Sequence, residues 1–325
     1  MATAENAKLQ YEAGQNAVAM SALTDSGDHT LFTSAATLWS GKAGNAPVIR
    51  PNGLLTGGAL TTNATNNLVT VAALTCNLAG VVTSVAGASS PAITRPATNV
   101  SKVNSITVNS SGALAVVAGT DGATTAFSET RGAAGGPPLI PVGSIEIGQV
   151  RVTTSAAGLI AASEIFQVVG THVERADFPL WDTNNGTGSI TFLGALPLIH
   201  TGSVAKAVYA SYSTPIFADV ALASDFVPPE TSHSISSTQV YGTTLGATSS
   251  TLGQGSFTAY LSNGVSDPLV ALKNATLWFK FFPDRYATPY ILCQGKLGIS
   301  RTFPAADSLQ AACTISASTA ATEVA

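Results

Sequence analysis

The chain has few charged residues. Asp, Glu, Lys and Arg make up 10% of its 325 residues, against about 25% in a typical soluble domain. Two long stretches, residues 51–94 and 231–266, contain none of the four. Interface cores are depleted in charge relative to free surface. The deficit therefore indicates that repeated contacts between subunits cover much of this surface.

The chain also lacks a basic excess and a long apolar run. Its net charge is −4 and its pI is about 5.5, which argues against stable binding to a phosphate backbone. No uninterrupted run of about 18 apolar residues occurs, so no transmembrane helix is predicted. Residues 1–10 have no basic start followed by an apolar segment, the pattern of a secretory signal. Synthesis in a cytoplasm is the resulting expectation.

Cysteine pairs and the common catalytic motifs are missing too. The three cysteines, Cys76, Cys293 and Cys313, are widely spaced and are interpreted as buried free thiols. There is no Gly-x-Ser-x-Gly elbow, phosphate-binding loop or dinucleotide-binding glycine motif. We therefore predict no enzyme, no catalytic residue and no cofactor.

One small cluster contains residue types that bind metal ions, but its spacing is not that of a familiar metal site. His172, Glu174 and Asp177 stand at i, i+2 and i+5, which matches neither a helical His pair nor a familiar strand pair. We interpret this stretch as a polar linker and predict no metal site.

Threonine, serine, asparagine and glycine are abundant instead, and they favour strands and turns. A mean hydropathy of +0.30 argues against disorder. The predicted fold is mainly β, an antiparallel sandwich or barrel. An N-terminal helix is expected over residues 4–20, rich in Ala, Glu, Lys and Gln. A short helix is expected between Gly264 and Thr276, with Ser266 as N-cap and Pro268 at its first position.

Two strands have a pattern that predicts their environment. In the last one, Leu309, Ala311, Cys313 and Ile315 would face inward and the residues between them outward. Before Gly148 the apolar residues Ile145 and Ile147 are odd-numbered, and after it Val150 and Val152 are even-numbered. Such a shift is expected where a β-bulge adds one residue to a strand. The aromatic run of residues 278–282 predicts a core strand; a carbohydrate platform is the alternative.

A change in composition near residues 170–177 predicts a domain boundary. There, four charged or titratable residues follow a charge-poor tract. The expected domains are an accessory β-rich domain over 1–172 and a second β-domain over 173–325.

The final third of the chain resembles the tail tube proteins of tailed bacteriophages. The likeness lies in KAVYASYSTPIFADVALASDFVPPE (206–230), in an uncharged stretch ending in FTAYL, and in GKLGISRTFPAADSLQAACTIS (295–316). It is one of pattern and order, without an invariant motif. Stretches within residues 44–58 and 137–150 resemble accessory β-domains of phage structural proteins.

The resemblance implies a tail tube domain over 173–325, a β-sandwich with one helix whose six copies close into a ring. Stacked rings would form the conduit for DNA ejection, with viral DNA passing through without stable binding. Other partners would be the tape measure, terminator and distal tail proteins, and the protein would be located in the virion tail after assembly in the bacterial cytoplasm. The accessory domain would lie outside the tube and clash with a contractile sheath, so a non-contractile tail is expected.

Two groups of assembly residues follow from this interpretation. The charge-free segment 231–266 is predicted to bridge neighbouring rings, with the ring-stacking candidates Thr243, Thr244, Leu245, Gly246, Gly253 and Gln254. The closing segment supplies the assembly and core-strand candidates Arg301, Phe303, Asp307, Leu309, Cys313 and Ile315.

Two other classes of protein fit the same sequence. A capsid decoration or fibre protein would also be β-rich and poor in charge, but it commonly forms trimers. An enzyme or sugar-binding module would place the aromatic residues 278–290 and nearby acids in a cleft, with two carboxylates about 5 to 9 Å apart.

Overall fold

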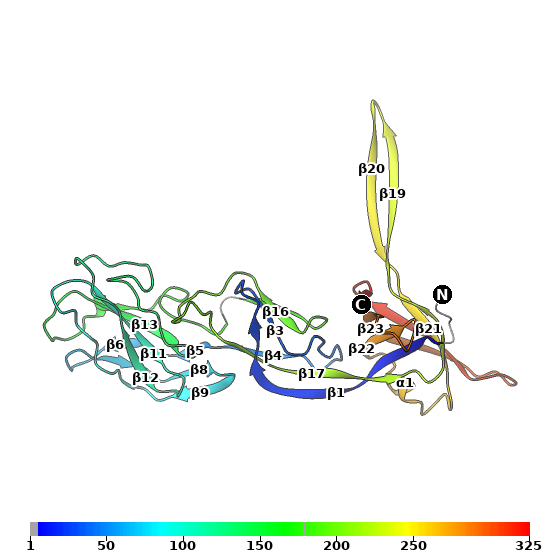
Figure 1. Ribbon diagram of the computed structural model, residues 1–325, viewed down its shortest axis with the longest axis horizontal. Coiled ribbons are helices and arrows are strands. Elements are labelled where there is room, and N and C mark those ends of the chain that lie inside the picture. Colours follow the sequence, from blue (N-terminus) through cyan, green and yellow to red (C-terminus); the bar gives the residue numbers. More distant parts are fainter. Residues whose placement is uncertain (1–5, 178–179) are drawn as a thin grey trace. The chain divides into compact units, whose positions relative to one another are not determined.

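A computed structural model describes residues 6–177 and 180–325 (Figure 1). The described chain is mainly β, as its composition predicts. It divides into two compact units: unit 1 comprises residues 1–18, 38–47 and 212–325, and unit 2 comprises residues 19–37 and 48–211. The boundary expected at 172/173 falls inside unit 2.

Unit 1 is built on an antiparallel sheet in the order β18-β21-β24-β23-β22-β1, with β25 paired to β23. The sheet ends at β18, so it is open and does not form a closed barrel. Strands β1 and β17 pair with each other and continue into unit 2. The strands are β1 (Lys8–Ala22), β17 (Val208–Asp219), β18 (Ala223–Val227), β19 (Thr231–Val240), β20 (Thr243–Leu252), β21 (Gly255–Tyr260), β22 (Thr276–Phe282), β23 (Tyr290–Thr302), β24 (Gln310–Ala317) and β25 (Thr322–Val324).

The core of unit 1 is formed largely by side chains of β1 and β21 to β24. In β24 the predicted alternation is confirmed: Ala311, Cys313 and Ile315 are buried, whereas the residues between them are exposed. Leu309 precedes the strand and is half-buried. In β22, Trp278 and Phe279 are buried, so the aromatic run is a core strand.

The helix predicted over residues 4–20 is wrong. The described part of that segment, from Asn6, belongs largely to β1, and residues 4 and 5 lie outside the described residues. Strand β1 pairs with β22 from Lys8↔Phe282 to Tyr11↔Phe279, and Leu9 and Tyr11 are buried. Ladder bonds and burial outweigh helix propensity, which is a weak prior.

The short helix predicted after Gly264 is present as α1 (Pro268–Ala271), but its N-cap is Asp267 and not Ser266. The Asp267 carboxylate turns back to the preceding loop. There it accepts hydrogen bonds from the backbone N–H of Ser262 at 3.1 Å and of Gly264 at 2.5 Å. The carboxylate thus stabilises the loop before the helix.

Unit 2 contains several small antiparallel sheets. Their orders are β10-β7-β6, β12-β11-β13-β14, β15-β16-β3-β2 and β5-β8-β9, and β4 pairs with β17. The elements are β2 (Thr24–Asp25), β3 (Leu31–Thr33), β4 (Val48–Pro51), β5 (Gly53–Gly57), β6 (Leu60–Thr62), β7 (Val69–Val71), β8 (Leu74–Leu78), β9 (Val81–Val85), β10 (Ala88–Ser89), β11 (Lys102–Val108), β12 (Leu114–Ala118), β13 (Ile145–Val152), the 3₁₀ turn η2 (Ala162–Glu164), β14 (Ile165–Phe166), β15 (Trp181–Asn184) and β16 (Ser189–Phe192).

The predicted bulge lies in β13. The register with β11 shifts from Ile106↔Gly148 to Thr107↔Glu146, so Ile147 is the extra residue. All eight residues of β13 are buried, which places this strand at the centre of unit 2.

The charged stretch near residue 174 is packed into unit 2, so its interpretation as a polar linker is wrong. His172 and Glu174 are 7% and 9% exposed. The Leu54 N–H donates to the Glu174 carbonyl at 2.9 Å, and the Ala176 N–H donates to the Leu54 carbonyl at 3.2 Å. These bonds connect the stretch to β5, more than a hundred residues earlier in the chain.

Candidate assembly surface

The most exposed element of unit 1 is the two-stranded hairpin of β19 and β20, which projects away from the rest of the unit (Figure 1). Its strands pair in unbroken register from Thr231↔Leu252 to Val240↔Thr243. Residues 241 and 242 form the turn, where Gly242 has φ +85°, a conformation that favours glycine. Ser and Thr fill most other positions, and their short or β-branched side chains suit a strand.

The hairpin has no core of its own. Every residue from Thr231 to Thr251 is exposed. Tyr241 at the tip is fully exposed, and Ile235 and Leu245 are 80% and 65% exposed. An isolated two-stranded hairpin is marginally stable in water at best. The hairpin therefore lacks, within the described part of unit 1, the packing that would stabilise it.

The ring-stacking candidates lie in two places on this hairpin. Thr243, Thr244, Leu245 and Gly246 open β20, just after the turn. Gly253 and Gln254 lie at its base, where the Gly253 N–H donates to the Glu230 carbonyl at 2.8 Å. The sequence analysis did not identify the tip, residues 241–242, although Gly242 is itself a turn signal.

The closing segment places its assembly candidates around one loop. Arg301 in β23 donates to the Gly264 carbonyl at 2.5 Å, and its guanidinium lies 5.9 Å from the centre of the Phe303 ring. Phe303 is 57% exposed. The Asp307 carboxylate accepts the Ser308 N–H at 2.6 Å. This loop connects β23 to β24 and leaves an aromatic ring on the surface of unit 1.

Cys313 and Ile315 belong to the core and not to the surface. Both are buried, and burial raises the pKa of the Cys313 thiol to about 12. Cys293 is likewise buried, with its pKa raised to about 12, and Cys76 with its pKa raised to about 11. These thiols are free, as the sequence predicts.

Unit 2 contains a buried polar network that the sequence did not predict. The Glu146 carboxylate lies in the core, where it binds Arg131, Ser105 and Gln149. Burial raises the pKa of Glu146 even with the Arg131 guanidinium beside it. Because these partners come from β11, β13 and the loop before β13, the network ties that loop to the sheet.

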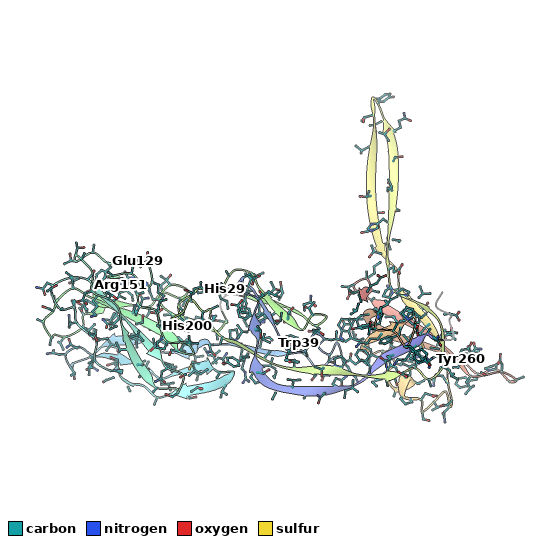
Figure 2. The ribbon with its side chains drawn as sticks, in the orientation of Figure 1. His29, Trp39, Glu129, Arg151, His200 and Tyr260 are labelled. Carbon is teal, nitrogen blue, oxygen red and sulfur yellow. The ribbon has the colours of Figure 1, made fainter. Side chains whose placement is uncertain are left out.

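A second ion pair lies on the same strand. Arg151 binds both oxygens of Glu129, at 2.6 and 2.8 Å; both residues are labelled in Figure 2. Its guanidinium also lies 4.5 Å from the centre of the Phe166 ring and 3.3 Å from His172 Nε2. Burial and the nearby Arg151 charge lower the pKa of His172. The His172 ring therefore contacts Arg151, and it does not form a metal site with Asp177.

Glu174 is the least satisfied member of this region. Its carboxylate is buried, and burial raises its pKa to about 7. Neither of its carboxylate oxygens has a hydrogen-bond partner. Lys206 is buried as well, donates to the Arg175 carbonyl at 2.7 Å, and has its pKa lowered by burial.

The described residues do not assemble a metal site. Within 6–177 and 180–325, no group of three or more His, Cys, Asp and Glu is placed to hold a metal ion. Nor do those residues include a helix with the length and apolar character needed to span a membrane.

No family model matches the chain, and no curated protein or solved structure is significantly similar to it.

Proposed function

We propose that this chain is a structural subunit without catalytic activity that assembles with copies of itself. The hairpin of β19 and β20 is the observation that carries the proposal. It continues for ten residue pairs, contains no charged residue and is exposed throughout residues 231–251. A hairpin of this kind is stabilised only when a partner covers it.

The specific form of the proposal is the major tail tube protein of a tailed phage. Six copies would form a ring, and the hairpin would bridge one ring to the next. The likeness of residues 206–230 and 295–316 to tail tube proteins supports this assignment. So does the net charge of −4, because a wall without a basic excess lets DNA pass with little adhesion. Unit 2 would then be an additional domain attached to the tube.

Electron microscopy of the purified protein at rising concentration tests the proposal. Six-fold rings or stacked tubes with a central channel are the expected result. Trimers that never stack would contradict it and favour a capsid decoration protein. Monomers at every concentration would contradict both.

A shortened hairpin tests the role of the arm itself. Replacing residues 235–248 by Asn-Gly joins Ser234 to Ser249, which are already register partners, through a favourable two-residue turn. Unit 1 should keep its melting temperature, because the removed residues are exposed. Tubes should no longer form, and deletion of residues 243–253 should also block their growth. Normal tubes from either variant would refute the bridging role.

A further inference from the structure

The two long edges of the hairpin lack the features that keep exposed strands from pairing. Soluble proteins protect edge strands with charge, proline, bulges or short length. Strands β19 and β20 are ten residues each, contain neither charge nor proline, and keep their register without a shift. Their outer backbone groups therefore offer a template for another strand.

The end strand of the sheet in the same unit is built differently. Strand β18 has five residues, and its register with β21 shifts between Ser224 and Val227. Within this shift Asp225 has φ +57° and puts a charge on the edge. Protection at β18 and its absence at β19 and β20 indicate that the hairpin edges are used for pairing.

We propose that the hairpin of one copy pairs through its backbone with the same hairpin of a second copy. The two edges are equal in length, so pairing can run along all ten residues. Neither carries charge, so like-charge repulsion does not oppose the contact. The facing side chains are largely Ser and Thr, whose cross-strand pairs are favourable. This inference rests on the proposed function, because it names the contact through which the copies assemble.

The register identifies which amides would make the contact. The two-residue turn makes Val240 and Thr243 a hydrogen-bonded pair, and hydrogen-bonded and non-hydrogen-bonded pairs alternate from there. The N–H groups of odd-numbered residues in β19, such as Ser237, then point outward. In β20 the even-numbered residues, such as Thr248, do so. The N–H of Ser236 points inward.

Proline at an outward position removes no bond within the hairpin but blocks an added strand. We would compare Ser237→Pro with Ser237→Ala, and Thr248→Pro with Thr248→Ala, in the full chain. Sedimentation over a concentration series measures assembly. Because several backbone bonds are lost, each proline should raise the concentration for half-assembly by roughly tenfold or more over its alanine control.

Hydrogen exchange of the unmodified protein provides the second measurement. The outward amides of residues 231–252 should exchange as freely as solvent-exposed amides before assembly and become protected afterwards. Assembly with these amides still unprotected, or unchanged assembly of both proline variants, would overturn the inference and leave the proposed function standing. A protein that never assembles would overturn both.

Discussion

Truncating Ile315 to alanine should strongly destabilise unit 1, because this side chain is enclosed by backbone. Ile315 in β24 is fully buried. A Cβ built on Gly295 would lie 2.6 Å from Ile315 Cγ2, and one built on Gly255 would lie 3.2 Å from its Cβ. The backbones of both neighbouring strands thus pack directly on this residue, and neither glycine has a side chain that could fill a cavity.

The magnitude follows from the atoms removed. Three carbons at about 0.8 kcal/mol each account for roughly 2.4 kcal/mol of lost transfer free energy. The cavity that remains adds to this, which places the total near the upper half of the observed range, about 4 kcal/mol. Thr314→Ala is the matched control, since Thr314 is exposed on the same strand and should cost less than about 0.5 kcal/mol.

Urea unfolding followed by tryptophan fluorescence measures these values. Trp39 and Trp278 belong to unit 1 and Trp181 to unit 2, so a Trp181→Phe background reports on unit 1 alone. A loss below about 1 kcal/mol for Ile315→Ala, far under the usual cost of a large core truncation, would refute the packing argument. Equal losses for the two variants would refute the assigned face of β24.

Three further predictions concern buried groups. Arg131→Met should destabilise unit 2 by about 3 to 5 kcal/mol in urea unfolding, because it leaves Glu146 buried without its cation; Lys102→Met, at a partly exposed pair, should cost at most about 1 kcal/mol. Burial raises the pKa of Glu174 from 4.5 to about 7, so the folded state holds an extra proton between these values and stability falls as pH rises through them. Glu174→Gln should remove this contribution, and melting temperatures that respond identically to pH in both proteins would contradict it. With the pKa of Cys293 raised to about 12 and the other thiols also buried, a disulfide reagent at pH 8 should label the cysteines only after unfolding; rapid labelling of the native protein would be the opposite result.

Periodicity predicted the fold best where one face of a strand is buried. Residues 313–316 alternate in polarity, and residues 311–316 alternate in burial, so the sequence pattern predicts which face is buried. The bulge near Gly148 was readable from the spacing of the apolar residues, although both faces of β13 are buried. At the N-terminus the composition favoured a helix, but pairing of Leu9 and Tyr11 with β22 is a tertiary contact that a local propensity cannot register.

The candidate surface was predictable in its location but not in its detail. The absence of charge marked residues 231–266 as unusual, and a hairpin lies there. Its register could not be read, because both faces are exposed and no hydrophobic pattern distinguishes them. The buried network of unit 2 was hidden for another reason. Arg131, Glu146 and Ser105 are far apart in the chain, and the sheet alone brings them together.

The distribution of charge within the fold strengthens the case for assembly. Among the described residues, several of the few charged side chains are buried, including Glu12, Glu146, Arg151, Glu174 and Lys206. The surface is therefore poorer in charge than the composition alone suggests. Surface charge keeps free proteins apart, and this chain has little of it where its longest exposed strands lie. Contact between copies along those strands meets no electrostatic opposition, whereas the ion pairs inside unit 2 act only within that unit. We expect this distribution of charge in a subunit whose hairpin associates with other copies while unit 2 stays folded by itself.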